Sequence, residues 1–260
     1  MRRRVATPDE LERAVRQYGP GRAGRELRRR GLIPPIAGAS GPTLIAHTAA
    51  TGQGVTSSTI NTTGTTLLVA GVSAYADTAG ITDSAGNTWS SAPLYHVNGD
   101  AGIQIFYVIS PTTSASHTFT TQSNGYPSLC VQAWGSFTGI SLDVYNGATA
   151  AQPGSITPNH NGELVVTAMT SYSATASTAS VDSGFTISDQ EPGVEGVDVG
   201  AAFAYLVQTT ATAIDPTWSD TGSIKASTIA AFTGTSSGGA SGPNPRPVNW
   251  PQAVWRSAYR

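Results

Sequence analysis

Few side chains in this 260-residue chain have the types and spacing that chemistry requires. The four histidines, at positions 47, 96, 117 and 160, match no metal-ligand spacing. His160 belongs to the run Asn159-His160-Asn161-Gly162, which is typical of a hairpin turn. The single cysteine, Cys130, lies in an apolar run, so we expect it to be a small buried core residue. One cysteine also excludes an internal disulfide framework.

The sequence carries no signature of catalysis. It contains neither a Gly-x-Ser-x-Gly elbow nor a glycine-rich phosphate loop. Residues 31–224 include no lysine or arginine, the side chains that commonly stabilise anionic intermediates. A glycan-cleaving enzyme would need two carboxyl groups about 5–10 Å apart, which a sequence does not reveal. We therefore predict that the chain is not an enzyme and uses no cofactor and no metal ion.

Sugar binding is the next chemistry to weigh, because aromatic faces stack on sugar rings while amides and carboxylates bond the hydroxyls. Trp89 and Tyr95 lie close in sequence to Asn98 and Asp100, and Tyr126 lies in a later loop. These five residues are the candidate glycan contacts. The alternative is that the aromatic rings among them pack inside the fold, which is the commoner fate of tryptophan in a β-sandwich.

Four carboxylates, at Asp189, Glu191, Glu195 and Asp198, fall within ten residues and are interspersed with glycine. Oxygen-rich loops suit Ca²⁺, but this spacing matches no EF-hand loop. An ordinary acidic surface loop accounts for the same pattern, so the question of calcium at 189–198 stays open at this point.

Basic residues are confined to the two ends of the sequence. Residues 1–30 hold ten arginines, whereas residues 31–224 hold twelve acidic residues and no basic one. Because guanidinium groups pair well with carboxylates, the first segment is expected to anchor the chain to other proteins, and the aromatic tail is expected to dock as well. The side chains assigned to anchoring are Arg2, Arg3, Arg4, Arg28, Arg29, Arg30, Trp250 and Trp255.

Nucleic acid is an alternative partner for the arginines, since clustered basic charge is its usual footprint, and a solvated N-terminal segment is another. No recognition motif accompanies the arginines, however, and phosphates would repel the acidic body. Nucleic acid is therefore not the expected partner. A membrane is not expected either, because no apolar run reaches the roughly 20 residues of a spanning helix.

The elements that must position these side chains are strands. Runs of Val, Ile, Thr, Tyr and Phe alternate with Gly, Asn, Asp and Ser turns from about residue 43 to 236. The clearest predicted strands are 66–75, 103–109, 128–137, 163–172, 201–207 and 226–232. The pattern favours an all-β, jelly-roll-like sandwich at 41–236. A short basic helical arm precedes it at 1–40, and a Gly/Ser/Pro linker with the aromatic tail follows at 237–260.

An internal repeat sharpens this prediction. Leu67-Leu68-Val69 aligns with Leu164-Val165-Val166, and Phe137-Thr138-Gly139 aligns with Phe232-Thr233-Gly234. On the second alignment Ile229 takes the place of Trp134, which favours a packing role for Trp134. The repeats could form two small domains, but we expect them to interleave in one sandwich, because a lone repeat would expose a sheet face.

The run from Gly64 to Gly139, with its Thr82-Asp83-Ser84-Ala85-Gly86-Asn87-Thr88-Trp89 segment, resembles a β-sandwich module of minor tail and other virion proteins of phages that infect actinobacteria. The resemblance implies a multicopy or homo-oligomeric virion component that contacts other virion proteins and host-surface glycans. Met1-Arg2-Arg3-Arg4 leads into no apolar signal region, which fits assembly in the host cytoplasm. A carbohydrate-binding module or glycan-active surface protein is the alternative.

Overall fold

The computed structural model describes residues 41–75, 79–97, 99–172, 178–193 and 197–236, and this part of the chain is all-β, without a helix. The first repeat holds β1 (Thr43–Thr51), β2 (Leu67–Ala74), β3 (Ile81–Asp83), β4 (Ser90–Ser91), β5 (Tyr95–His96), β6 (Gly102–Ile109), β7 (Phe119–Thr121) and β8 (Ser128–Gly135). The second holds β9 (Phe137–Ala148), β10 (Glu163–Tyr172), β11 (Ala179–Val181), β12 (Thr186–Glu191), β13 (Gly200–Gln208), β14 (Trp218–Asp220) and β15 (Ser223–Ser236). The predicted arm at 1–40 and tail at 237–260 lie outside the described residues.

Each repeat forms one large antiparallel sheet of its own. The order in the first sheet is β1-β8-β2-β6-β4, with β5 also paired to β6. The order in the second sheet is β9-β15-β10-β13-β12. It is the same order, because β9, β15, β10, β13 and β12 take the places of β1, β8, β2, β6 and β4. The expectation that the two repeats interleave is therefore wrong. We expected interleaving because a lone repeat would expose one face of its sheet. In the structure the other repeat covers one face of each large sheet, and short strands cover the other face.

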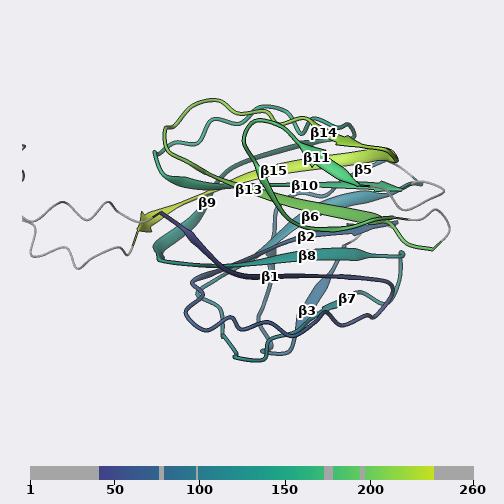
Figure 1. The fold of residues 1–260 in the computed structure, drawn as a ribbon, viewed down its shortest axis with the longest axis horizontal. Helices are drawn as coiled ribbons and strands as arrows, with labels where there is room; N and C mark the ends of the chain where they lie inside the picture. The colour runs from purple at the N-terminus through teal and green to yellow at the C-terminus, as the bar shows by residue number, and fades with distance from the viewer. Residues whose placement is uncertain (1–40, 76–78, 98, 173–177, 194–196, 237–260) are drawn as a thin grey trace, which may run out of the picture. The chain divides into compact units, whose positions relative to one another are not determined.

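Four layers of strands stack on one another, as Figure 1 shows from top to bottom. The two large sheets face each other across a central core. The two-stranded sheet β3-β7 covers the outer face of the first sheet, and β11-β14 covers that of the second. Each large sheet is thus buried on both faces, once by the other repeat and once by strands of its own repeat.

Burial on both faces explains why β2 is an unbroken apolar run rather than an alternating one. All eight residues of Leu67–Ala74 are buried. Leu67 and Val69 point into the central core, while Leu68 and Ala70 point into the outer core beneath β3 and β7. The strand keeps its period of two, but both faces need apolar side chains.

Strand register shows that Phe232, not Ile229, is the counterpart of Trp134. Trp134 pairs with Leu67, and Phe232 pairs with the equivalent Leu164. Ile229 lies three residues away, on the opposite face, and packs in the outer core of the second repeat. A shift of an odd number of residues moves a side chain to the other face of a sheet, which is why the sequence alignment misplaced this position.

The two repeats meet through reciprocal aromatic contacts. Trp134 packs edge-to-face on Tyr205 with ring centroids 4.9 Å apart, and Tyr107 packs edge-to-face on Phe232 at 5.4 Å. Trp134 and Phe232 hold equivalent positions, and so do Tyr107 and Tyr205. The sheets are therefore related by an approximate two-fold axis, because each repeat offers the other the same pair of residues.

The described sandwich has two different ends. At one end Thr43 pairs with Gly135 and Ser236 pairs with Phe137, so the first and last strands leave the fold side by side. Figure 1 shows both at the left of the view. At the other end lie the turns that follow β2 and β5 and those that precede β8 and β13. We call this second end the loop end.

Candidate functional site

The structure places Trp89 and Tyr95 in different layers. Trp89 is half-buried in the outer core of the first repeat, where it packs edge-to-face on Phe119 and its Nε1 donates to Asp83 Oδ2 at 2.8 Å. Tyr95 packs against the central core instead, with its ring over Gly147 of β9. The two rings therefore do not form one sugar platform.

The other glycan candidates also separate. Asp100 forms an ion pair with Lys225 at 3.1 Å, and Asn98 lies outside the described residues. Tyr126 is 45% exposed and has a left-handed backbone, with φ of 48°. Of the three aromatic candidates, Tyr126 is the exposed one, and it lies at the loop end.

A neighbour of Tyr126 was not singled out from the sequence. Tyr75 is 46% exposed, and its backbone N–H donates to Gly125 O at 2.6 Å, directly before Tyr126. Its hydroxyl donates to Gly99 O at 2.6 Å. Val199 N donates to Tyr126 O at 2.9 Å. Hydrogen bonds thus tie four turns together around two exposed rings, and we call Tyr75 and Tyr126 the tyrosine patch.

The acidic loop makes contacts with β1 rather than converging on one point. Asp189 accepts from His47 Nδ1 at 3.0 Å, and Asp198 accepts from Thr51 Oγ1 at 3.0 Å. Burial raises the pKa of Glu191, and the charges of Asp189 and Asp198 raise it further. Glu195 lies outside the described residues. Among the residues described, these acids form no three-ligand group, so the structure adds no support for calcium there.

A buried polar network surrounds His117 in the first repeat. Its Nε2 lies 3.1 Å from Asp83 Oδ1, its Nδ1 lies 2.9 Å from Thr62 Oγ1, and both ionisable side chains are fully buried. Burial alone would raise the pKa of Asp83, but hydrogen bonds from His117, from Trp89 and from two backbone N–H groups lower it overall.

The order hydroxyl–imidazole–carboxylate is that of a nucleophilic triad, but its accessibility argues against that role. Thr62 is fully buried, and its hydroxyl already donates to Ser114 O at 3.1 Å. A substrate has no route to this oxygen. The network instead fastens the turn after β3 to the chain that enters β7.

A second ionisable cluster lies in the second repeat, at the end from which the terminal strands leave. Asp143, His160 and Glu163 place one ligand atom each within 4.8 Å of one another. Glu163 Oε1 accepts from the backbone N–H of His160 at 2.8 Å and lies 3.1 Å from its Nδ1. Burial raises the pKa of Glu163, and the nearby charge of Asp143 adds to the shift.

Sequence reasoning missed this cluster because Asp143 is distant in the chain from His160 and Glu163, and no motif links the three. Asp143 lies at an irregularity of the β9–β15 ladder, between Leu142 and Tyr145, and a bulge redirects a side chain. The signal that could have found the cluster is a comparison of the repeats, because Asp143 follows Leu142 as the apolar Ile45 follows Leu44.

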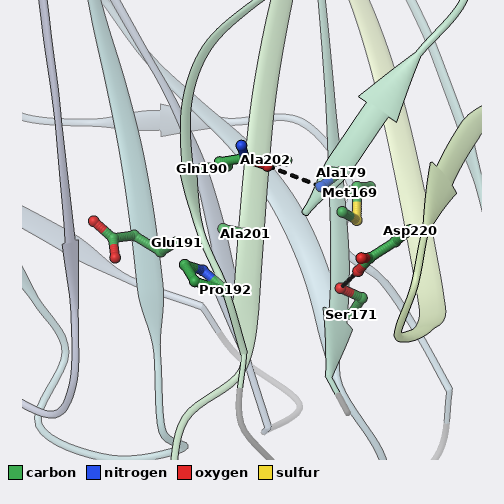
Figure 2. A pocket seen from close by; sticks show the side chains of 9 residues that line it. All are labelled: Met169, Ser171, Ala179, Gln190, Glu191, Pro192, Ala201, Ala202 and Asp220. Atoms are coloured by element: carbon green, nitrogen blue, oxygen red, sulfur yellow. Dashed lines mark hydrogen bonds between the residues drawn. The ribbon is translucent and has the colours of Figure 1, made fainter. Parts of the chain in front are cut away.

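A small pocket with an empty volume of about 160 Å³ is lined by β10, β12 and β13 of the second large sheet and by β11 and β14, which cover that sheet. In Figure 2 Ser171 and Asp220 point toward one another and are joined by a hydrogen bond, while Glu191 extends away from them. Gln190 Oε1 accepts from the backbone N–H of Ala179 at 2.9 Å. Small-molecule sites usually span about 300–1,000 Å³, so this hollow is too small for a typical organic substrate.

The proposed anchoring residues, Arg2 to Arg30 and Trp250 with Trp255, lie outside the described residues, so their role stays a prediction. Within the described part of the chain, no helix has the length and apolar character needed to cross a membrane. Comparisons with family models, with curated proteins and with solved structures found no match to this chain. Function must therefore be argued from the geometry and from the charge pattern.

Proposed function

We propose that this chain is a structural component of a phage particle, in the tail or on the head surface, that presents the loop end of its sandwich to a host-surface glycan. The observation that carries the proposal is the separation of the two ends. The strands that continue into both flanking segments leave the fold together, beside residues 135–137. The tyrosine patch lies at the opposite end, as expected of a module held at one end and binding at the other.

The distribution of charge supports attachment through the flanking segments. Residues 31–224 carry no lysine or arginine, while ten arginines lie within residues 1–30. Charges of one sign keep copies of the sandwich apart in solution, and the arginines can pair with carboxylates of a neighbouring subunit. A multicopy arrangement would also let many weak glycan contacts act together.

The tyrosine patch replaces the predicted Trp89 cluster as the proposed glycan site. Trp89 is held in the outer core by Asp83 and Phe119, whereas Tyr75 and Tyr126 keep almost half of their surface exposed. Their aromatic faces suit stacking on a sugar ring, and hydrogen bonds between the turns keep them in place. This exposure also favours the second candidate function, a carbohydrate-binding module that acts outside any particle.

The glycan part of the proposal is tested with the full chain carrying a fluorescent label. Saturable binding to host cell-wall glycans is expected, with a loss of about tenfold or more in affinity for the Tyr75→Ala/Tyr126→Ala double variant. Tyr145→Ala is the matched control, because Tyr145 is 48% exposed but lies on β9, an edge strand of the second sheet that carries no residue of the tyrosine patch. Equal binding by all three proteins would refute the patch.

The particle part needs a separate measurement. An antibody raised against the sandwich should label purified particles from the source lysate, and deletion of residues 1–30 should abolish incorporation of the chain. Glycan binding without any labelling of particles would instead favour the free carbohydrate-binding module.

A further inference from the structure

The Asp143–His160–Glu163 cluster contains a carboxylate oxygen that nothing satisfies. Glu163 is 1% exposed, and its Oε2 has no hydrogen-bond partner, while its Oε1 accepts from the backbone and ring of His160. The carboxyl group beside it is that of Asp143, which also only accepts. Two carboxylates at hydrogen-bonding range require a proton or a cation between them, because neither can donate.

The remaining surroundings hold Asp143 in position without neutralising it. Asn159 donates to both of its oxygens, through the backbone N–H at 2.8 Å and through Nδ2 at 2.6 Å. These bonds leave a lone pair on each oxygen and fix the direction of the carboxylate, as outer partners of metal ligands do. The Thr233 hydroxyl lies 3.2 Å from His160 Nδ1 and is a further oxygen at the edge of the cluster.

The part of the chain that the structure describes brings no lysine or arginine to this place. Between residues 31 and 245 the sequence has a single basic side chain other than histidine, Lys225. Lys225 forms its ion pair with Asp100, beside the loop end and far along β15 from Thr233. Among the described residues, His160 is therefore the one cationic side chain that can face the carboxylate pair, and otherwise a proton or a cation from solution must lie between the two carboxyl groups.

Comparison of the two repeats shows that the cluster is not needed to build the fold. The position equivalent to Asp143 is Ile45, next to the corresponding irregularity of the β1–β8 ladder. Glu163 precedes Leu164 as Thr66 precedes Leu67, and both leucines face the central core. The same sheet order thus forms in the first repeat with no ionisable group at these two places, so the order of the strands does not depend on them.

We propose that Asp143, His160 and Glu163 bind one divalent transition-metal ion of the Zn²⁺ or Mn²⁺ kind. The donor set decides the class of ion, because an imidazole beside carboxylates suits such metals, whereas Ca²⁺ prefers oxygen ligands alone. His160 is 65% exposed, so positions left open by the three side chains face solvent. The ion would clamp the turn 159–162 against β9 and supply the charge that Glu163 Oε2 lacks.

The test measures Zn²⁺ binding to the full chain by isothermal titration calorimetry, with Co²⁺ absorption in the visible range as a second readout. One ion per chain is expected. Affinity should fall by about tenfold or more in His160→Ala and in Glu163→Gln, since each removes or neutralises one ligand. His160 is exposed, so its variant should fold, and a circular dichroism melt checks both proteins.

His47→Ala is the matched control, because His47 also contacts a carboxylate, Asp189, but has no third ligand among the described residues. The control should bind Zn²⁺ as the unmodified chain does, and an excess of Ca²⁺ should not displace the ion. Absence of binding by the unmodified chain would overturn the proposal. So would binding that survives both His160→Ala and Glu163→Gln, or binding that His47→Ala abolishes.

Discussion

Gly71 of β2 packs directly against Ala168 and Phe203 of the second sheet, and its replacement by alanine should destabilise the fold. An added Cβ would stand 2.9 Å from Ala168 Cβ and 3.3 Å from Phe203 Cδ2. Carbon atoms pack best at about 3.5–4.0 Å, so the first contact is too short by roughly 0.6 Å or more. Ala168 Cβ is fixed to the backbone of β10 and cannot rotate away. The sheets would have to separate locally.

The expected cost follows from two opposing effects. Overpacking a well-packed core costs about 1–3 kcal/mol. Gly71 does not have a left-handed φ, so alanine can adopt its backbone conformation. Alanine also restricts the unfolded chain, which raises the free energy of unfolding by about 0.4–1 kcal/mol. We therefore expect Gly71→Ala to lower the free energy of unfolding by about 1–2 kcal/mol, measured by urea denaturation. Gly80→Ala is the control, because its new Cβ would meet only the flexible end of Gln122, at 3.2 Å.

The equivalent position in the second repeat provides a decisive second variant. Gly71 follows Leu67 by four residues, as Ala168 follows Leu164. Gly71→Ala combined with Ala168→Gly moves one methyl group from the second sheet to the first and removes the clash. The free energy of unfolding of the double variant should exceed the value expected from adding the two single effects by about 1 kcal/mol or more. Additive effects, or a Gly71→Ala protein as stable as the original, would refute the close approach.

Three further measurements address the buried polar groups. Because the pKa of Asp83 is lowered on folding, its stabilising effect should be complete above about pH 4 and lost as pH falls through the lowered value. In Asp83→Asn the loss of stability at low pH should be smaller but still present, because folding also lowers the pKa values of Asp143 and Asp182. Trp218→Phe should cost about 1 kcal/mol or more in urea denaturation, because Trp218 Nε1 donates to the buried Thr167 Oγ1 at 3.0 Å. Burial raises the pKa of the Cys130 thiol well above its usual value, so Cys130 should react with iodoacetamide only after unfolding; rapid labelling of the native protein would contradict this.

The strands could be predicted from the sequence more readily than their arrangement. Leu67-Leu68-Val69 and its counterpart at 164–166 are β-rich apolar runs, and their similarity correctly indicated equivalent central strands. The Phe-Thr-Gly match at 137 and 232 was misleading, because Phe137 begins β9 whereas Phe232 lies inside β15. Short outer strands such as β3 and β11 have three residues each, too few to show a period.

The candidate sites depended on information that no local pattern contains. Trp89 lies in a polar stretch typical of a protein surface, but its indole N–H donates a hydrogen bond to Asp83, six residues earlier. Tyr75 becomes a partner of Tyr126 only through the bond to Gly125, across the sheet. Asp143 and Glu163 meet because a bulge in β9 lies across β15 from the start of β10. Strand register brings the last two pairs together, and the register could not be read from the local patterns of this sequence.

The approximate two-fold axis makes this chain the covalent equivalent of a symmetric dimer. In an isologous interface residue i of one subunit contacts residue j of the other and the reverse, as the Trp134–Tyr205 and Phe232–Tyr107 contacts do here. One residue, Ser136, separates β8 from β9, so association of the halves is intramolecular and independent of protein concentration. In a dimer of two identical subunits, each side chain of one subunit is also present at the same position of the other. Fusion removes that constraint, so one half can hold Asp143 and Glu163 while the other keeps isoleucine and threonine at the equivalent places and carries the tyrosine patch instead.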